Sequence, residues 1–82
     1  MALQPDDVLD ARGLHCPLPL LKAKQALARL DTGAVLYVMA TDPGSWKDFE
    51  TFVGQSNDVE LVSREEAEDE YRYWIRKGAA VT

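Results

Sequence analysis

The sequence predicts an α/β fold, a two-layer βαβαββ sandwich in which two helices cover one face of a mixed four-stranded sheet. Two segments with helical spacing of apolar residues alternate with short apolar segments of strand type. The last two strand-type segments follow each other with only a polar connection between them. A helix that links two strands makes them parallel with a right-handed crossover, whereas a short connection makes them antiparallel. The sheet should therefore contain both kinds of pairing.

The first strand and the first helix are predicted over residues 8–12 and 17–30. Residues 8–12 alternate weakly between apolar and polar side chains, and the following Gly13 is typical of a loop. In the helical segment apolar residues recur every three or four positions, and the opposite face is polar. Thr32 and Gly33 then mark the end of this helix.

The second strand and the second helix are predicted on either side of a turn at residues 41–45. Residues 34–40 form a nearly unbroken apolar run, which is typical of a central strand or of one covered on both faces. The helix should end near Gly54. Its start could be capped by Asp42, with a proline in the first turn, or by Ser45, with an acidic residue three positions later. The apolar stripe of this helix comprises Trp46, Phe49 and Val53.

The last two strands are predicted over residues 59–63 and 71–76, and the second of them alternates clearly. An acidic run over residues 65–70 connects them. We expect this run to be a solvated hairpin loop rather than a binding surface, because a run of like charges is usually hydrated. The two strands should therefore pair as an antiparallel hairpin.

Length and composition limit the class of protein. A chain of 82 residues can form one modest core, so we expect a single domain over residues 1–82, with flexible segments at 1–7 and 79–82. The net charge of -5 disfavours nucleic acid as a direct partner, since binding to phosphates relies on Lys and Arg. No segment is long enough to span a bilayer and no secretory signal is visible. The expectation is therefore cytoplasmic residence without a membrane partner.

Cysteine and histidine each occur once, as Cys16 and His15. A single cysteine cannot form an internal disulfide, and this pair cannot supply the ligands of a protein-only zinc site, so no metal is expected. Adjacent residues on an extended chain point in opposite directions. His15 is therefore expected to be an exposed loop residue rather than the base of a Cys–His nucleophilic pair.

The thiol lies where the first helix begins, in the segment Cys-Pro-Leu-Pro. Pro17 is the natural first residue of this helix and Pro19 is tolerated in its first turn, so both should stiffen the helix start. Cys16 would lie at or next to the N-cap, where free N–H groups and the helix dipole favour a thiolate, and we predict a pKa below about 8.5. The loops with Gly13 and Asp42 should meet there and support the helix start, because both leave the carboxyl edge of the sheet. The Asp42 carboxylate would oppose the lowered pKa unless it turns toward its own helix.

Two interpretations of the residues around the thiol remain open. A lone cysteine is often a small buried hydrophobic side chain, although Cys is a poor residue for a helix start compared with Ser, Thr, Asp or Asn. Arg12, His15, Lys22 and Lys24 would form a basic cluster near the thiol, which is suited to steering a protein partner. Alternatively, the two lysines are only the solvated side of an amphipathic helix.

A lone exposed thiolate supports a narrow range of chemistry. Without a resolving cysteine, a metal or an acid–base set, it can accept a sulfane sulfur as a persulfide and release it to the thiol of another protein. A redox-sensing thiol is one alternative. A regulatory interaction module, in which the cysteine is only structural, is the other. A protein that exchanges sulfur in this way would be a sulfur carrier.

Residues 10–19 contain a Cys-Pro-x-Pro motif, Lys24 follows in the helix, and Asp42 precedes a proline after the second strand. Residues 71–73 are Tyr-Arg-Tyr, and residues 76–78 are Arg-Lys-Gly. In this arrangement, which spans nearly the whole chain, the sequence closely resembles the TusA (SirA-like) family of sulfur carriers.

The resemblance implies the βαβαββ sandwich and a persulfide carried covalently on Cys16, with no separate cofactor. It also implies a sulfur donor, such as a cysteine desulfurase or a rhodanese-like protein, and an acceptor, such as a DsrE-like protein. The sulfur would serve tRNA thiolation, sulfur oxidation or related sulfur trafficking. We expect this sulfurtransferase-type carrier to be a monomer that acts with partner proteins.

Overall fold

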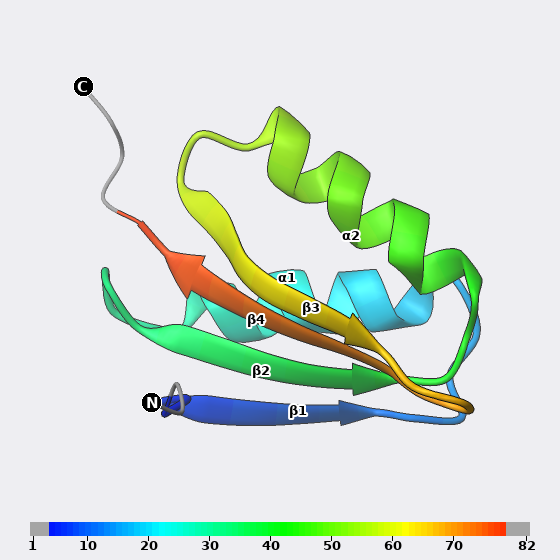
Figure 1. The fold of residues 1–82 in the computed structure, drawn as a ribbon. Coiled ribbons are helices and arrows are strands. Elements are labelled where there is room, and N and C mark those ends of the chain that lie inside the picture. The colour runs from blue at the N-terminus through cyan, green and yellow to red at the C-terminus, as the bar shows by residue number, and fades with distance from the viewer. Residues whose placement is uncertain (1–3, 79–82) are drawn as a thin grey trace.

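The computed structural model describes residues 4–78, which contain two helices and four strands (Figure 1). In chain order these are β1 (Asp7–Ala11), α1 (Leu18–Ala28), β2 (Val35–Ala40), α2 (Gly44–Gln55), β3 (Val59–Glu66) and β4 (Tyr71–Lys77). The order of elements is the predicted one. Residues 1–3, which are part of the first segment predicted to be flexible, and residues 79–82, which are all of the second, lie outside the described residues.

The four strands form one mixed sheet in the order β1-β2-β4-β3. β1 pairs with β2 in parallel, whereas β4 pairs with both β2 and β3 in the antiparallel direction. The strands on either side of each helix therefore run in the same direction, and β4 lies between β2 and β3. This arrangement confirms the predicted α/β class and the predicted mixture of pairings.

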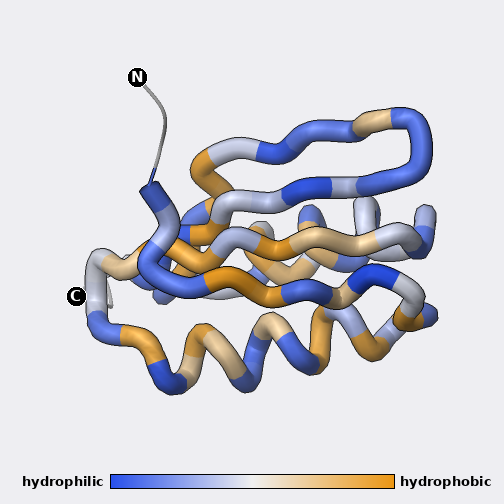
Figure 2. The backbone as a smooth tube through the Cα atoms, turned by 90° about the horizontal axis from the view of Figure 1, so that it is seen from below, coloured by the Kyte–Doolittle hydropathy of each residue, from blue (hydrophilic) through white to orange (hydrophobic). Residues whose placement is uncertain are grey.

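Both helices pack on one face of this sheet, as predicted. α1 contacts β1 and β2, α2 contacts β3, and the two helices contact each other (Figure 1). In Figure 2 the central strand β2 is largely hydrophobic, whereas the tip of the β3–β4 hairpin is hydrophilic. The core thus lies between the helix layer and the central strands, and its buried residues are Ala11, Ala23, Ala26, Leu27, Leu36, Val38, Ala40, Phe49, Tyr73 and Ile75.

The carboxyl ends of the two helices lie within two residues of the predicted ends. α1 ends at Ala28 rather than at residue 30, because the N–H of Arg29 bonds to the C=O of Ala26 (3.1 Å) and tightens the last turn. α2 ends at Gln55, one residue past Gly54, so the predicted end near this glycine is confirmed. The hydroxyl of Ser56 closes the turn by donating to the carbonyl four residues earlier (2.7 Å).

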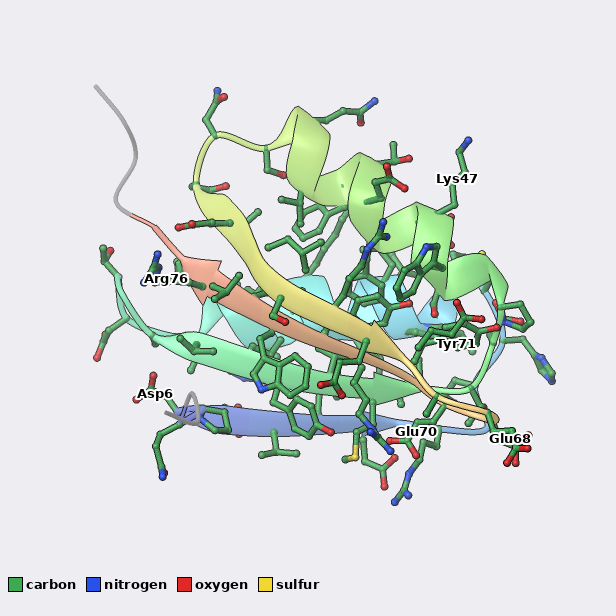
Figure 3. All side chains as sticks on the ribbon, in the orientation of Figure 1. Asp6, Lys47, Glu68, Glu70, Tyr71 and Arg76 are labelled. Carbon is green, nitrogen blue, oxygen red and sulfur yellow. The ribbon has the colours of Figure 1, made fainter. Side chains whose placement is uncertain are left out.

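The acidic connection is shorter than predicted. β3 continues to Glu66, so the prediction of a loop over residues 65–70 is wrong for its first two residues. The cause is Arg72 of β4, which lies opposite Glu65 in the ladder and donates to its carboxylate at 3.5 Å. Arg72 also donates to Glu70 (3.1 Å), near the turn of the hairpin (Figure 3). Cross-strand pairs of opposite charge stabilise a sheet, so part of the acidic run becomes strand.

β1 begins and β4 ends at the same end of the sheet, opposite to the starts of α1 and α2. In the N-terminal segment, Asp6 is bonded to the sheet and Asp7 belongs to it. The backbone and carboxylate of Asp6 both bond to the backbone of Val35 (2.8 Å each), and Asp7 begins β1. At the other terminus Lys77 of β4 donates its N–H to the C=O of Ala34 (2.8 Å).

A buried hydrogen bond joins α2 to β4. The hydroxyl oxygens of Ser45 and Tyr73 lie 2.7 Å apart, and both residues are buried. We expect Ser45→Ala to lower the free energy of unfolding by about 1–3 kcal/mol, because the Tyr73 hydroxyl loses that partner inside the core. Urea denaturation measures the loss. Adding Tyr73→Phe should recover much of it, and a double variant less stable than Ser45→Ala would contradict this account.

Candidate functional site

Two loops are joined at the end of the sheet where β1 and β2 finish. The N–H of Gly13, in the loop before α1, donates to the Oγ1 atom of Thr41, in the loop before α2 (2.9 Å). The N–H of Cys16 donates to the Oδ2 atom of Asp42 across the same gap (3.2 Å). Gly13 has a φ of 83°, a left-handed conformation that glycine adopts without strain. The structure therefore brings Gly13, Cys16 and Asp42 together at one edge, where the sequence places them.

The start of α1 lies one residue later than predicted. Pro17 is the N-cap, with φ -99° and ψ 17°, and the first helical residue is Leu18. Pro19 is buried within the first turn, and the peptide bond between Cys16 and Pro17 is cis. Cys16 therefore precedes the N-cap. The predicted placement of the cysteine next to the N-cap is confirmed, but Pro17 is not the first residue of the helix.

Neither of the two candidate caps closes the start of α2. Its N-cap is Pro43, and no side chain bonds to the free N–H groups of its first turn. Asp42 instead turns its carboxylate toward the N–H of Cys16, and Ser45 turns inward to Tyr73. Asp42 thus stabilises the loop before α1 rather than its own helix.

Cys16 is exposed, so the alternative of a buried, inert cysteine is wrong. Its thiol donates a hydrogen bond to the Oδ2 atom of Asp48, one turn into α2. His15 is also exposed, as predicted, and its side chain makes no hydrogen bond within residues 4–78. The group that contacts the sulfur is therefore a carboxylate rather than an imidazole.

The electrostatic surroundings of the thiol are opposite to the prediction. The hydrogen bond to Asp48 is the main cause that raises the pKa of Cys16, followed by partial desolvation and by the negative charges of Asp48 and Asp42. The predicted lowering required the Asp42 carboxylate to face its own helix, and it does not. Because Cys16 lies outside the N-cap, these nearby carboxylates outweigh the helix dipole, whose effect is confined to the first turn.

The raised pKa has a measurable consequence. The rate of Cys16 alkylation by iodoacetamide, followed against pH, should have its midpoint above the ordinary thiol value of about 8.5, because nearby carboxylates favour the protonated form. The same measurement in urea is the control, since unfolding separates Asp48 from the thiol. The midpoint should then return to the ordinary value. A folded-state midpoint below that of the unfolded chain would contradict this prediction.

Gly44 keeps space beside the sulfur. A Cβ atom at this position would lie 2.9 Å from the Oδ2 atom of Asp42, 3.4 Å from the Cβ atom of Cys16 and 3.7 Å from its Sγ atom. A larger residue would therefore push on both the carboxylate and the cysteine. The glycine leaves this flank of the thiol open.

The predicted basic cluster has less free positive charge than the sequence suggests, because one of its residues is paired with a carboxylate. Arg12 is exposed, but its guanidinium donates two hydrogen bonds to the Asp10 carboxylate (2.9 and 2.8 Å), which neutralises its charge locally. Lys22 and Lys24 of α1 are exposed, as predicted, and Lys24 lies over the ring of Phe52 at 5.2 Å. Within residues 4–78 neither lysine forms an ion pair, so the unpaired positive charge of the predicted cluster lies on α1.

Sequence reasoning did not identify Asp48 as a site residue. In the sequence it is only the acidic residue three positions after Ser45, which supports one of the two predicted caps of this helix. The available signal was its position one turn past a helix start that shares an edge with Cys16. Asp48 also lines an open cavity of about 350 Å³ between α1 and α2, together with residues such as Leu20, Lys24 and Phe52.

Within residues 4–78, no three His, Cys, Asp or Glu side chains are grouped in a way that could hold a metal ion. Neither of the helices in this part of the chain is long and apolar enough to cross a membrane.

Comparison with known proteins places this arrangement among sulfur-transfer proteins. A family model described as sulfurtransferase TusA matches residues 7–77. The sulfur carrier protein TusA of Allochromatium vinosum is 47% identical over 72 residues, which cover 88% of this chain and 93% of that protein. The putative sulfur carrier protein YrkI of Bacillus subtilis is 38% identical over 76 residues, which cover 93% of this chain and 100% of that protein. The crystal structure of a SirA-like protein from Desulfitobacterium hafniense superimposes with a TM-score of 0.68 and 28% identity, covering 89% and 99% of the two chains.

Proposed function

This chain belongs to the TusA sulfurtransferase family and is a sulfur carrier, and on that premise we propose that Cys16 carries the sulfur as a persulfide. The observation that supports this assignment is the exposure of the thiol at the edge where two loops meet. Cys16 is also the only cysteine in the chain. A persulfide forms reversibly on an accessible cysteine sulfur and needs no further cofactor.

The proposed partners are proteins that exchange sulfur through their own cysteines. A cysteine desulfurase or a rhodanese-like protein would load Cys16, and a DsrE-like protein would receive the sulfur, for tRNA thiolation, sulfur oxidation or related trafficking. Each exchange requires two sulfur atoms in contact, so donor and acceptor must use the surface around Cys16 in turn. We place this monomeric carrier in the cytoplasm, without direct contact to nucleic acid or membrane.

Mass spectrometry after incubation with glutathione persulfide tests this function. The protein should gain the mass of one sulfur atom, at Cys16, and should lose it again when a thiol acceptor is added. A redox-sensing thiol would instead gain oxygen with peroxide and show no transferable sulfur. Failure of the intact, folded protein to gain sulfur would refute the proposed function.

Docking of the donor should depend on positive charge from α1. Lys22 is exposed one turn past the helix start. Charges of this kind change the rate of encounter more than the final affinity. We expect Lys22→Glu to slow sulfur transfer from a persulfide-loaded cysteine desulfurase by about tenfold at low salt, and much less at high salt.

Arg29→Glu is the matched control, because it makes the same charge reversal on an exposed residue at the far end of α1. Its transfer rate should stay within about twofold of the parent at both salt concentrations, because the residue is far from the thiol and its charge is screened. Equal rates for the Lys22 variant and the parent at low salt would place the docking surface elsewhere.

A further inference from the structure

Asp48 lies beside the thiol on a part of α2 that is fixed to the core by the residue after Asp48 and by a residue before it. The next residue, Phe49, is fully buried and stacks on the ring of Tyr73, with 4.4 Å between ring centroids and 21° between planes. Ser45, one turn earlier, bonds to the hydroxyl of the same tyrosine. The carboxylate that accepts the hydrogen bond from Cys16 therefore stands on a rigid element, which is what a reacting group requires.

We propose that Asp48 is a catalytic residue, whose carboxylate takes the proton of the Cys16 thiol as this sulfur attacks the persulfide of the donor. The inference rests on the proposed function of Cys16 as the sulfur acceptor. A general base must lie within hydrogen-bond reach of the proton that it removes. The Oδ2 atom of Asp48 meets this condition in the resting carrier, since it already accepts a hydrogen bond from the thiol.

The loading step balances without an oxidant or a reductant. The Sγ atom of Cys16 attacks the terminal sulfur of the donor persulfide, and a new S–S bond forms. The S–S bond of the donor breaks, and its electron pair stays on the donor cysteine sulfur. The proton of Cys16 passes to Asp48 and then to the departing donor sulfur. A thiol and a persulfide thus give a persulfide and a thiol, and delivery to the acceptor is the same step in reverse.

The other polar groups near the thiol are engaged elsewhere or make no contact with it. The Oδ2 atom of Asp42 accepts the N–H of Cys16, so this carboxylate serves the backbone of the loop. Arg12 is paired with Asp10 and has no proton-accepting capacity at neutral pH. Among the described residues, Asp48 is the one whose side chain hydrogen-bonds to Sγ.

The same contact explains why a base is needed. The thiolate, not the thiol, is the nucleophile in sulfur exchange. The carboxylates around Cys16 raise the pKa of its thiol, so the resting carrier holds the protonated form at neutral pH. Attack on a persulfide then requires the proton to leave during the reaction, and Asp48 is the acceptor in place.

The test compares sulfur loading with alkylation in Asp48→Asn and Asp48→Glu. Asparagine keeps the shape and the hydrogen-bond acceptor but removes the charge and the capacity to take a proton. We expect Asp48→Asn to lower the pH midpoint of iodoacetamide alkylation, because the thiolate is no longer opposed by this charge. We expect the same variant to gain sulfur from glutathione persulfide at least about tenfold more slowly at neutral pH. Asp48→Glu should recover part of the loading rate.

Glu50→Gln is the matched control, since it removes one negative charge from an exposed position of the same helix. It should change neither measurement. An Asp48→Asn variant that loads sulfur as fast as the parent or faster would overturn the proposal, and so would an unchanged alkylation midpoint. If the parent itself gains no sulfur, the proposed function of Cys16 fails as well. A loading defect in Asp48→Asn but not in Glu50→Gln supports both the proposed function of Cys16 and the proposed role of Asp48.

Discussion

Cys16→Ser is expected to reduce sulfur loading to background while leaving the free energy of unfolding within about 1 kcal/mol of the parent. The thiol is exposed and precedes the N-cap, so it contributes little to packing. A serine hydroxyl can still donate to Asp48, and the backbone N–H at this position can still donate to Asp42. Mass spectrometry after treatment with glutathione persulfide measures loading, and urea denaturation measures stability.

The two measurements on this variant separate the carrier from the regulatory module. A module in which Cys16 is only structural would keep its interactions after the substitution. A carrier loses all transfer, because the chain contains no second cysteine. Persistent loading of Cys16→Ser, or a loss of several kcal/mol in stability, would contradict the assignment of this residue.

Phe49→Ala is expected to lower the free energy of unfolding by about 3–5 kcal/mol, because it removes a fully buried aromatic ring and leaves a cavity. The ring fills the space between α2 and β4, where it stacks on Tyr73. The total stability of a domain of this size is about 5–15 kcal/mol, so the variant should be close to unfolding. Urea denaturation followed by circular dichroism gives the value.

Phe52→Ala is the comparison for this prediction. Phe52 belongs to the same helix but is only partly buried, beneath the ammonium group of Lys24. Its removal should lower stability by less than half as much as Phe49→Ala, since less apolar surface leaves the core. Equal losses for the two variants would show that Phe49 is not the main anchor of α2.

The number, type and order of the elements could be predicted because each depends on a local pattern. The stripe of Trp46, Phe49 and Val53 has the period of a helix, and the apolar run at residues 34–40 has the composition of a central strand. Element ends depend on contacts between distant residues. β3 extends into the acidic run because Arg72 of the opposite strand pairs with Glu65. The residues of the acidic run alone do not predict this cross-strand pair.

In the candidate site, too, features that depend on local sequence could be predicted, and features that depend on distant residues could not. The position of Cys16 at an exposed helix start could be predicted from two prolines and from the parallel pairing of β1 and β2. The direction of its pKa shift could not, because Asp48 is 32 residues away along the chain and approaches the sulfur only after α2 has packed. Local reasoning accounts for the helix dipole but not for a carboxylate delivered by another helix.

The described chain reaches both of its ends at the side of the sheet opposite to Cys16, beside Asp6 and Lys77. A strand rises about 3.3 Å per residue, so the length of β2 separates these ends from the thiol by roughly 20 Å. A fusion partner, a purification tag or a sensor surface attached through either end would therefore leave the sulfur facing solution. The carrier can accordingly be immobilised or built into a longer polypeptide as a sulfur-delivery module without obstructing the cysteine that its partners must reach.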